Sequence, residues 1–229
     1  WLRIVKKKIK KCQKEKKIPI IVGGTGLYFS TITKGISKIP DIDKKTRNKV
    51  RQLFKTLGSK RFFDKLLSID PKVNGKILPS DTQRMQRAYE VFLKTKRSLF
   101  DWMINTKSDF TDYDIKKIFL DIPKKELLKN ISLRTETMFV DGCLEEVEKF
   151  NHLKLNKSLS ANKLIGVREI RDYLKGIISA DNCKELINIK TRQYAKRQNT
   201  WARGHMKNWN KIYAKDFNTL LKKVLKVAS

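Results

Sequence analysis

One threonine hydroxyl stands in a loop of glycines directly after a run of apolar residues. The segment from Ile18 to Gly26 reads Ile-Pro-Ile-Ile-Val-Gly-Gly-Thr-Gly, and Thr25 is its only polar side chain. Gly23, Gly24 and Gly26 remove side chains at the carboxyl end of an expected strand, which is where open α/β sheets bind their ligands. These residue types indicate an active-site loop in which Thr25 orients a reacting group. The motif alone leaves open the alternative of a tight turn that requires glycine.

A second group of residues capable of binding follows Ser80. Ser80 with Gln83 three residues later is typical of a capping box, which predicts that a helix begins here. The first two turns then carry two glutamines and two arginines, Gln83, Arg84, Gln86 and Arg87. Arginine normally stabilises the C-terminal end of a helix, so this placement favours an external phosphate, with glutamine at an adenine edge. The alternative is a solvated helix face with an internal arginine–Glu90 ion pair.

A third group lies near the end of the chain, in a segment expected to be helical. Its basic and amide residues recur at spacings of four, three and four, which places them on one stripe: Arg192, Lys196, Asn199 and Arg203. Tyr194 and Trp201 lie between them and offer aromatic surfaces. Unstacked RNA bases use such surfaces, so this stripe favours an RNA strand as ligand. A surface helix with a buried Trp201 is the alternative.

The charge of the chain favours the same class of partner. The 229 residues contain 53 Lys and Arg against 23 Asp and Glu, which gives a formal charge of +30. Such an excess favours a polyanion, because each neutralised phosphate releases counterions. Alternatively, a biased base composition of the gene could produce the same high lysine content.

Other residue types narrow the function further. The three cysteines, Cys12, Cys143 and Cys183, lie far apart and are expected to be reduced thiols. Two histidines, His152 and His205, argue against a histidine-based metal cluster. No apolar run approaches the roughly 20 residues that span a bilayer. We therefore expect a cytoplasmic monomer.

Strands and helices must position these groups. The five apolar residues Ile18–Val22 have the length and β-branched content of a strand buried on both faces of a parallel sheet. A similar run, Ile118–Ile122, predicts a second strand, and a basic amphipathic helix is expected over Trp1–Lys17. Apolar residues recur at helical spacing over Asp43–Met103, which predicts a helical insertion. The chain from Pro123 onward is expected to be mostly helical.

Five motifs follow one another along almost the whole chain. They are Ile18–Tyr28, Asp81–Ala88, Leu133–Met138 with Gly142–Val147, Leu164–Glu169, and Thr191–Trp201. In this order and spacing they resemble the bacterial tRNA dimethylallyltransferase family. The resemblance implies transfer of a dimethylallyl group from dimethylallyl diphosphate to N6 of adenine 37, beside the tRNA anticodon, with the help of Mg²⁺. It also implies a P-loop-NTPase-like parallel sheet core, residues 1–40 and 107–229, with a mostly helical insertion domain at residues 41–106.

The resemblance assigns roles residue by residue. It places Thr25 at the reaction centre, near the substrate amine and the departing diphosphate oxygen, in the loop of Gly23, Gly24 and Gly26. It implies that Arg47 and three further segments bind the anticodon stem-loop. The residues of these segments are Gln83, Arg84, Met85, Gln86, Arg87, Leu164, Ile165, Gly166, Val167, Arg168, Glu169, Thr191, Arg192, Gln193, Lys196, Arg197 and Gln198.

The sequence also departs from the family pattern. Lys96 replaces a glycine, and Val167 and Ala202 replace aromatic residues. The family begins with a phosphate-binding loop, G-x-x-x-x-G-K-[ST], and an aspartate general base, whereas none of the ten glycines here begins Gly-Lys-Ser or Gly-Lys-Thr. We therefore expect that the chain lacks the first segment of the family, which would hold most Mg²⁺ ligands. A split gene, a truncated gene and a partial sequence are open alternatives, and with a split gene a separate N-terminal fragment that carries the phosphate loop would be the partner.

Two alternatives stay open on the sequence. The chain could be a tRNA-binding module or remnant without catalysis. It could also resemble a prenyltransferase of free adenine nucleotides, although small substrates do not require so many basic helices.

Overall fold

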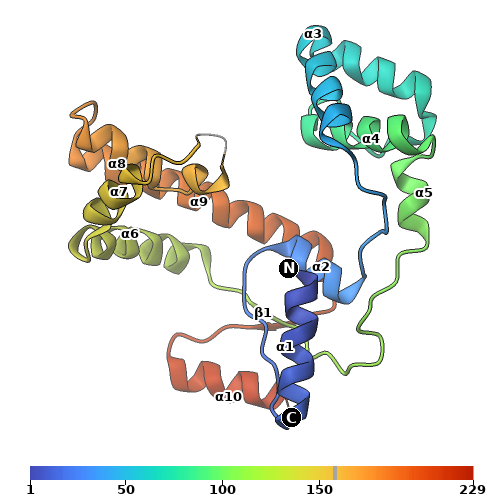
Figure 1. The fold of residues 1–229 in the computed structure, drawn as a ribbon. Coiled ribbons are helices and arrows are strands. Elements are labelled where there is room, and N and C mark those ends of the chain that lie inside the picture. The colour runs from blue at the N-terminus through green and yellow to red at the C-terminus, as the bar shows by residue number, and fades with distance from the viewer. Residues whose placement is uncertain (157–158, 229) are drawn as a thin grey trace. The chain divides into compact units, whose positions relative to one another are not determined.

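The computed structural model describes residues 1–156 and 159–228 of the chain (Figure 1). They form two compact units, one of residues 1–23 and 27–113 and the other of residues 24–26 and 114–229. The architecture is α/β and rich in helices, as predicted. A separate insertion domain at residues 41–106 stays a prediction. Among the described residues, no helix is long and apolar enough to cross a bilayer.

The first half of the chain is helical. Its elements are α1 (Leu2–Lys14), α2 (Gly26–Thr33), α3 (Lys44–Ile69), the 3-10 helix η1 (Pro71–Val73), α4 (Thr82–Thr95) and α5 (Leu99–Ile104). The predicted amphipathic helix at the start of the sequence is confirmed as α1. Its Lys6 lies 2.6 Å from Asp109, and Trp1 stacks on Tyr28 with ring centroids 4.2 Å apart.

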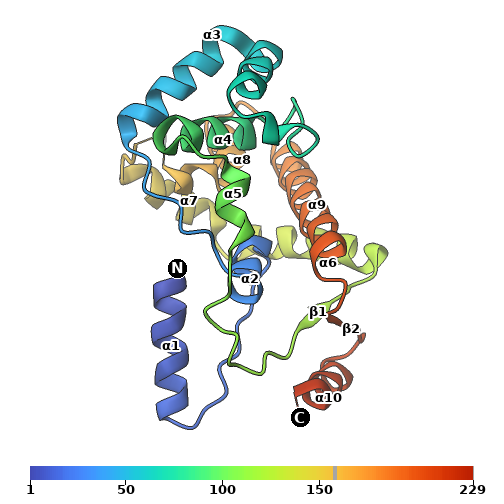
Figure 2. The ribbon, with the colours of Figure 1, turned by 90° about the vertical axis from the view of Figure 1, so that its right-hand side faces the viewer.

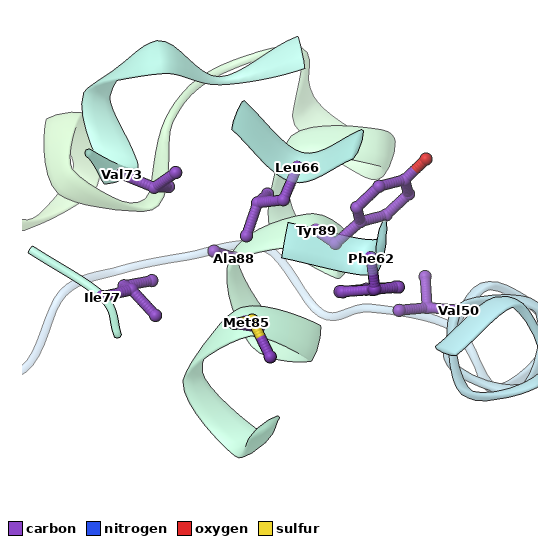
Figure 3. Close-up of a cluster of buried hydrophobic side chains, with 8 residues drawn as sticks. All are labelled: Val50, Phe62, Leu66, Val73, Ile77, Met85, Ala88 and Tyr89. Atoms are coloured by element: carbon purple, nitrogen blue, oxygen red, sulfur yellow. The ribbon is translucent and has the colours of Figure 1, made fainter. Parts of the chain in front are cut away.

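The core of the first unit lies where α3 packs on α4 (Figure 3). Its buried residues are Val50, Phe62, Leu66, Val73, Ile77, Met85, Ala88 and Tyr89. Phe62 is at the centre of the aromatic contacts, with its ring centroid 5.2 Å from Phe54 and 5.1 Å from Tyr89. The predicted helical spacing in this part of the chain is confirmed, because it brings these side chains to one interface.

Two backbone features shape these helices. Gly58 has φ of 70°, a left-handed conformation that divides α3 into two helical segments. Asp81, not Ser80, caps α4, because its carboxylate accepts a hydrogen bond of 3.1 Å from the backbone N–H of Arg84. The predicted capping box at Ser80 was therefore wrong by one residue. The N–H of Asp81 already donates to the Leu78 carbonyl, so the chain turns before Asp81 and the helix starts after it.

The second unit combines a small sheet with helices. Its elements are β1 (Ile118–Leu120), α6 (Lys124–Val140), α7 (Cys143–His152), the 3-10 helix η2 (Ser160–Lys163), α8 (Val167–Leu174), α9 (Ala180–His205), β2 (Asn210–Ile212) and α10 (Phe217–Ala228). β1 pairs with β2 in parallel, with Ile118 opposite Asn210 and Leu120 opposite Ile212 (Figure 2). The predicted strand at residues 118–122 is thus confirmed in shorter form.

The segment Ile18–Val22 is not a strand. Within the described residues it has no partner strand, and its side chains are open to solvent, with Ile18 83% and Val22 87% exposed. The prediction of a strand buried on both faces was wrong here. A parallel strand is stable only beside another strand that takes up its backbone hydrogen bonds, and the described sheet contains β1 and β2 alone.

Polar contacts hold α8 and α6 against α9 in the second unit. The side chain of Glu169 in α8 is 2% exposed, accepts a 2.9 Å hydrogen bond from the N–H of Gly166, and forms an ion pair with Lys190 of α9. The hydroxyl of Thr135 in α6 donates to Asn188 of α9 over 2.6 Å. Together with a buried apolar cluster that includes Ile170, these contacts fix the first half of α9 against its neighbours (Figure 1).

Truncating the centre of the first core tests its importance. We expect Phe62→Ala to lower the free energy of unfolding by about 3–5 kcal/mol, because it removes a fully buried ring and leaves a cavity. Urea unfolding followed by circular dichroism measures the change. Leu78→Ala, at a side chain that is 69% exposed, is the control and should change little. Equal effects of the two variants would contradict this description of the core.

The buried carboxylate of Glu169 gives a pH-dependent prediction. Burial raises its pKa, but the hydrogen bonds from Lys190 and from backbone N–H groups outweigh burial, so the pKa lies below its ordinary value of 4.5. Folding therefore favours the charged form, and its contribution is present above pH 4.5 and lost as the pH falls below it. We expect Glu169→Gln to cost about 2 kcal/mol at pH 7 and much less in acid.

Urea unfolding of Glu169→Gln and the unchanged protein at pH 7 and in acid measures this difference. Glu148→Gln, on an exposed position of α7, is the matched control and should cost little at either pH. A cost at Glu169 that does not depend on pH would show that its charge is unimportant.

Candidate functional site

Thr25 lies in the loop that leads into α2. The residue is exposed and directly precedes Gly26, the first residue of the helix. Within the described part of the chain its hydroxyl has no hydrogen-bond partner. The hydroxyl is therefore free to bind a substrate.

The glycines of this loop allow a close approach to α9. A β-carbon placed on Gly26 would lie 2.2 Å from Cδ2 of Trp201, and one placed on Gly24 would lie 2.0 Å from Nε2 of Gln198. A β-carbon on Gly23 would meet nothing within 4 Å. None of these three glycines has a left-handed backbone, so the alternative of a turn that requires positive φ does not hold. The lack of room for a side chain, and not the backbone conformation, explains why glycine occupies positions 24 and 26.

The face of α9 that meets this loop is aromatic and half-buried. Gln198, Trp201 and His205 share one side of the helix at spacings of three and four residues. The Trp201 ring stacks on His205 with centroids 4.4 Å apart and planes 3° from parallel. His205 Nδ1 also lies 3.0 Å from the Trp201 carbonyl oxygen. Trp201 is therefore half-buried between the loop and His205, and not fully buried as the alternative from the sequence held.

The predicted basic stripe of α9 is only partly free to bind RNA. Arg192 forms a 2.7 Å ion pair with Glu185 of the same helix, and the Thr191 hydroxyl donates to the Ile187 carbonyl. Arg197 lies over the Tyr194 ring at 5.7 Å. The predicted residues on this stretch that remain exposed are Gln193, Lys196 and Arg197.

A basic pocket of about 180 Å³ lies between the second half of α9 and the sheet. Its polar lining consists of Asp121, Asn199, Arg203, Lys207 and Lys211. None of the three cations is in an ion pair with a described residue. Three cations against one carboxylate favour an anion such as a phosphate group.

Sequence reasoning missed half of this pocket. It placed Asn199 and Arg203 on the basic stripe but gave no role to Asp121, Lys207 or Lys211. A signal was present, because Lys207 and Lys211 continue the four-residue spacing from Arg203, and Asp121 directly follows a strand.

The segment from Leu164 to Glu169 divides between surface and core. Leu164 and Arg168 are exposed, and Nε of Arg168 lies 3.8 Å from Asp172. Ile165 and Val167 pack against the buried cluster of the second unit, and Gly166 is buried with φ of 101°. The Glu169 carboxylate already binds Lys190 and the N–H of Gly166. Gly166 and Glu169 are buried and Ile165 and Val167 are half-buried, so these four residues pack in the unit, and their tRNA contacts stay a prediction.

The remaining predicted residues lie in the first unit. Gln83 and Arg84 are exposed at the start of α4, and Gln86 and Arg87 are half-buried. The Met85 side chain is fully buried in the core beside Phe62 and Leu66, and its tRNA contact stays a prediction. Arg47 is exposed near the start of α3.

Both arginines of α4 have partners in their own helix or its cap. Arg84 lies 3.4 Å from Asp81, and Arg87 lies 3.6 Å from Glu90. The internal arginine–Glu90 pair weighed as an alternative is therefore present. The Arg84–Asp81 pair is largely exposed and therefore weak, whereas the Glu90 partner of Arg87 is buried.

The described residues do not form a metal site of their own. No group of three or more His, Cys, Asp or Glu side chains among them could hold a metal ion. Burial raises the pKa of the Cys143 and Cys183 thiols, that of Cys183 to about 11, so both are protonated and poor metal ligands.

Comparison with known proteins gives consistent relatives. A tRNA dimethylallyltransferase from Pelagibacter ubique is 49% identical over 226 residues, which cover 99% of this chain and 72% of the relative. Another from a Wolbachia strain of Drosophila simulans is 39% identical over 88% of this chain and 68% of its own length.

Solved structures give the same likeness in three dimensions. The tRNA delta(2)-isopentenylpyrophosphate transferase of Staphylococcus epidermidis has a TM-score of 0.58 at 27% identity, covering 99% of this chain and 73% of its own. The tRNA isopentenylpyrophosphate transferase of Bacillus halodurans has a TM-score of 0.62 at 24% identity, covering 99% and 70%, and supports the fold alone. A family model described as IPP transferase matches residues 1–205. The chain belongs to the IPP transferase family.

Proposed function

We propose that the chain transfers a dimethylallyl group from dimethylallyl diphosphate to N6 of adenine 37 in tRNA. The observation that carries this proposal is the contact between two motifs far apart in the sequence, the glycine loop and α9. This contact holds the free hydroxyl of Thr25 on the same unit as a basic pocket suited to phosphate. A reaction with a diphosphate leaving group requires a donor for the departing oxygen and cations that neutralise phosphate charge.

The proposed reaction forms one bond and breaks another. The N6 amine of adenine attacks the allylic carbon, while the bond from that carbon to the diphosphate oxygen breaks and diphosphate leaves with the electron pair. The proton of N6 passes to a carboxylate general base, since an exocyclic amine is otherwise a poor nucleophile. Thr25 orients the amine and the departing oxygen toward each other.

Both units contribute to RNA binding in this proposal. Arg47, Gln83 and Arg84 on the first unit, and Leu164, Arg168 and Lys196 on the second, are exposed and suited to phosphates and unstacked bases. Turning adenine 37 out of the anticodon loop costs a few kcal/mol, which these contacts offset. The formal charge of +30 supports the same partner.

We place the diphosphate-binding part and the general base on a polypeptide segment that carries a phosphate loop, because the 229 residues contain no Gly-Lys-Ser or Gly-Lys-Thr. Mg²⁺ would be bound mainly by that segment and by the diphosphate, and would stabilise the charge of the leaving group. Because its substrate is tRNA, we place the reaction in the cytoplasm, with this chain as a monomer.

A reconstituted reaction tests the proposal. The chain is mixed with an anticodon stem-loop RNA, dimethylallyl diphosphate, Mg²⁺ and the part of the Pelagibacter ubique relative that the chain does not match. Mass spectrometry should detect dimethylallyl adenine. We expect Thr25→Ala to lower kcat by roughly 100-fold, as for the loss of one donor to a leaving oxygen. Thr25→Ser keeps the hydroxyl and should retain most activity. Absence of product in every combination would overturn the proposal.

Substitution of Arg84 tests the RNA contact of the first unit. We expect Arg84→Gln to weaken binding of the stem-loop and to reduce the slope of log affinity against log salt by about one, because one phosphate contact is lost. Fluorescence anisotropy over a salt series measures both quantities. Arg61→Gln removes the same charge from an exposed position of α3 and is the matched control. An equal loss in both variants would indicate a general effect of charge instead of a contact.

A further inference from the structure

We propose that Trp201 and Gln198 are positioning residues, which hold the loop of Gly24, Thr25 and Gly26 so that the Thr25 hydroxyl is correctly placed. Gln198 then acts on this loop and not on tRNA, which differs from the role that the family resemblance implied for it. The catalytic part of this inference rests on the proposed function.

The contact of Trp201 with Gly26 is too close for any side chain. A β-carbon on Gly26 would lie 2.2 Å from Cδ2, 2.4 Å from Cε3 and 2.5 Å from Cε2 of the indole. All three are atoms of a rigid ring, so no rotation of a flexible end could make room. The ring is also held by its stack on His205. The indole therefore forms a fixed wall behind the residue that follows Thr25.

Gln198 covers the residue on the other side of Thr25. Its Nε2 would lie 2.0 Å, and its Cδ 2.8 Å, from a β-carbon on Gly24. Gln198 is half-buried, whereas its neighbour Arg197 is exposed. A flexible amide can move aside, so this contact is more adaptable than that of the indole. Gln198 and Trp201 together enclose the backbone of the loop before and after Thr25.

The loop depends on these contacts because the segment before it has little support. Ile18 and Val22 are almost fully exposed, and no described residue pairs with the backbone of this segment as a strand. In contrast, α9 is a helix of 26 residues fixed at its first half by Lys190 and Asn188. We therefore infer that α9 positions the loop, and not the reverse.

A graded series of glycine substitutions tests this arrangement. We expect Gly26→Ala to lower kcat in the reconstituted reaction by roughly 100-fold, since a displacement of about 1 Å at a reacting group has that effect. Gly24→Ala should cost less, because the Gln198 amide can move. Gly23→Ala should cost the least of the three, since its added carbon meets nothing within 4 Å. The affinity for stem-loop RNA should stay within about twofold in all three, because α9 and α4 are unaltered.

A compensating substitution shows whether the Trp201 ring causes the loss of kcat in Gly26→Ala. Trp201→Leu removes the ring, so the double variant Gly26→Ala with Trp201→Leu should recover at least about tenfold in kcat over Gly26→Ala alone. Trp201→Phe keeps an aromatic ring and should relieve less. If the two substitutions simply multiply their losses, the indole does not position the loop and the proposal is overturned.

Direct binding and thermal unfolding separate this inference from the proposed function. Gln198→Ala should leave the Kd for stem-loop RNA unchanged within about twofold, while lowering kcat. A loss of affinity like that of Arg84→Gln would show that Gln198 contacts tRNA and would overturn its new role. Gly26→Ala should also lower Tm, and Trp201→Leu should suppress that shift. This coupling is measured without substrate, so it tests the packing even if no prenyl transfer is detected.

Discussion

The contact of a glycine backbone with the indole of Trp201 is the interaction on which the candidate site depends. It joins a loop that has no sheet around it to the longest helix of the second unit. The helix is in turn fixed by a buried carboxylate, Glu169, which binds Lys190 and the turn before α8. The loop is therefore held in place by α9, and α9 is in turn held in place by the core of that unit.

Positive charge constrains the rest of the molecule. With a formal charge of +30, repulsion between like charges opposes the compact state. Several carboxylates are used where they stabilise local structure: Asp81 caps α4, Glu169 links two helices, and Asp109 pairs with Lys6. Arg203, Lys207 and Lys211, which form no ion pair with a described residue, line one pocket with a single carboxylate, that of Asp121. This local excess of positive charge favours an anion there.

Sequence patterns predicted what depends on local periodicity and motif content. The helices that carry Phe62 and Met85 and the strand at Ile118 followed from spacing and composition, and the family followed from the resemblance of five ordered motifs. Patterns failed where burial depends on distant partners. Ile18–Val22 has the composition of a buried strand, yet burial requires neighbouring strands that composition cannot supply. The family resemblance placed Glu169 among the tRNA contacts, and the sequence could not show that its carboxylate is buried against Lys190 of another helix.

The exposed segment Ile18–Val22 has a consequence for handling the protein. Five apolar residues without charge, with an unpaired backbone, form the kind of window that templates intermolecular β-pairing and aggregation. Lys16 and Lys17 stand directly before it, and Pro19 removes one backbone donor inside it. Such gatekeeper residues oppose edge-to-edge association, because like charges repel and proline cannot extend a hydrogen-bonded ladder. Self-association should therefore increase at high salt, where the repulsion between lysines is screened.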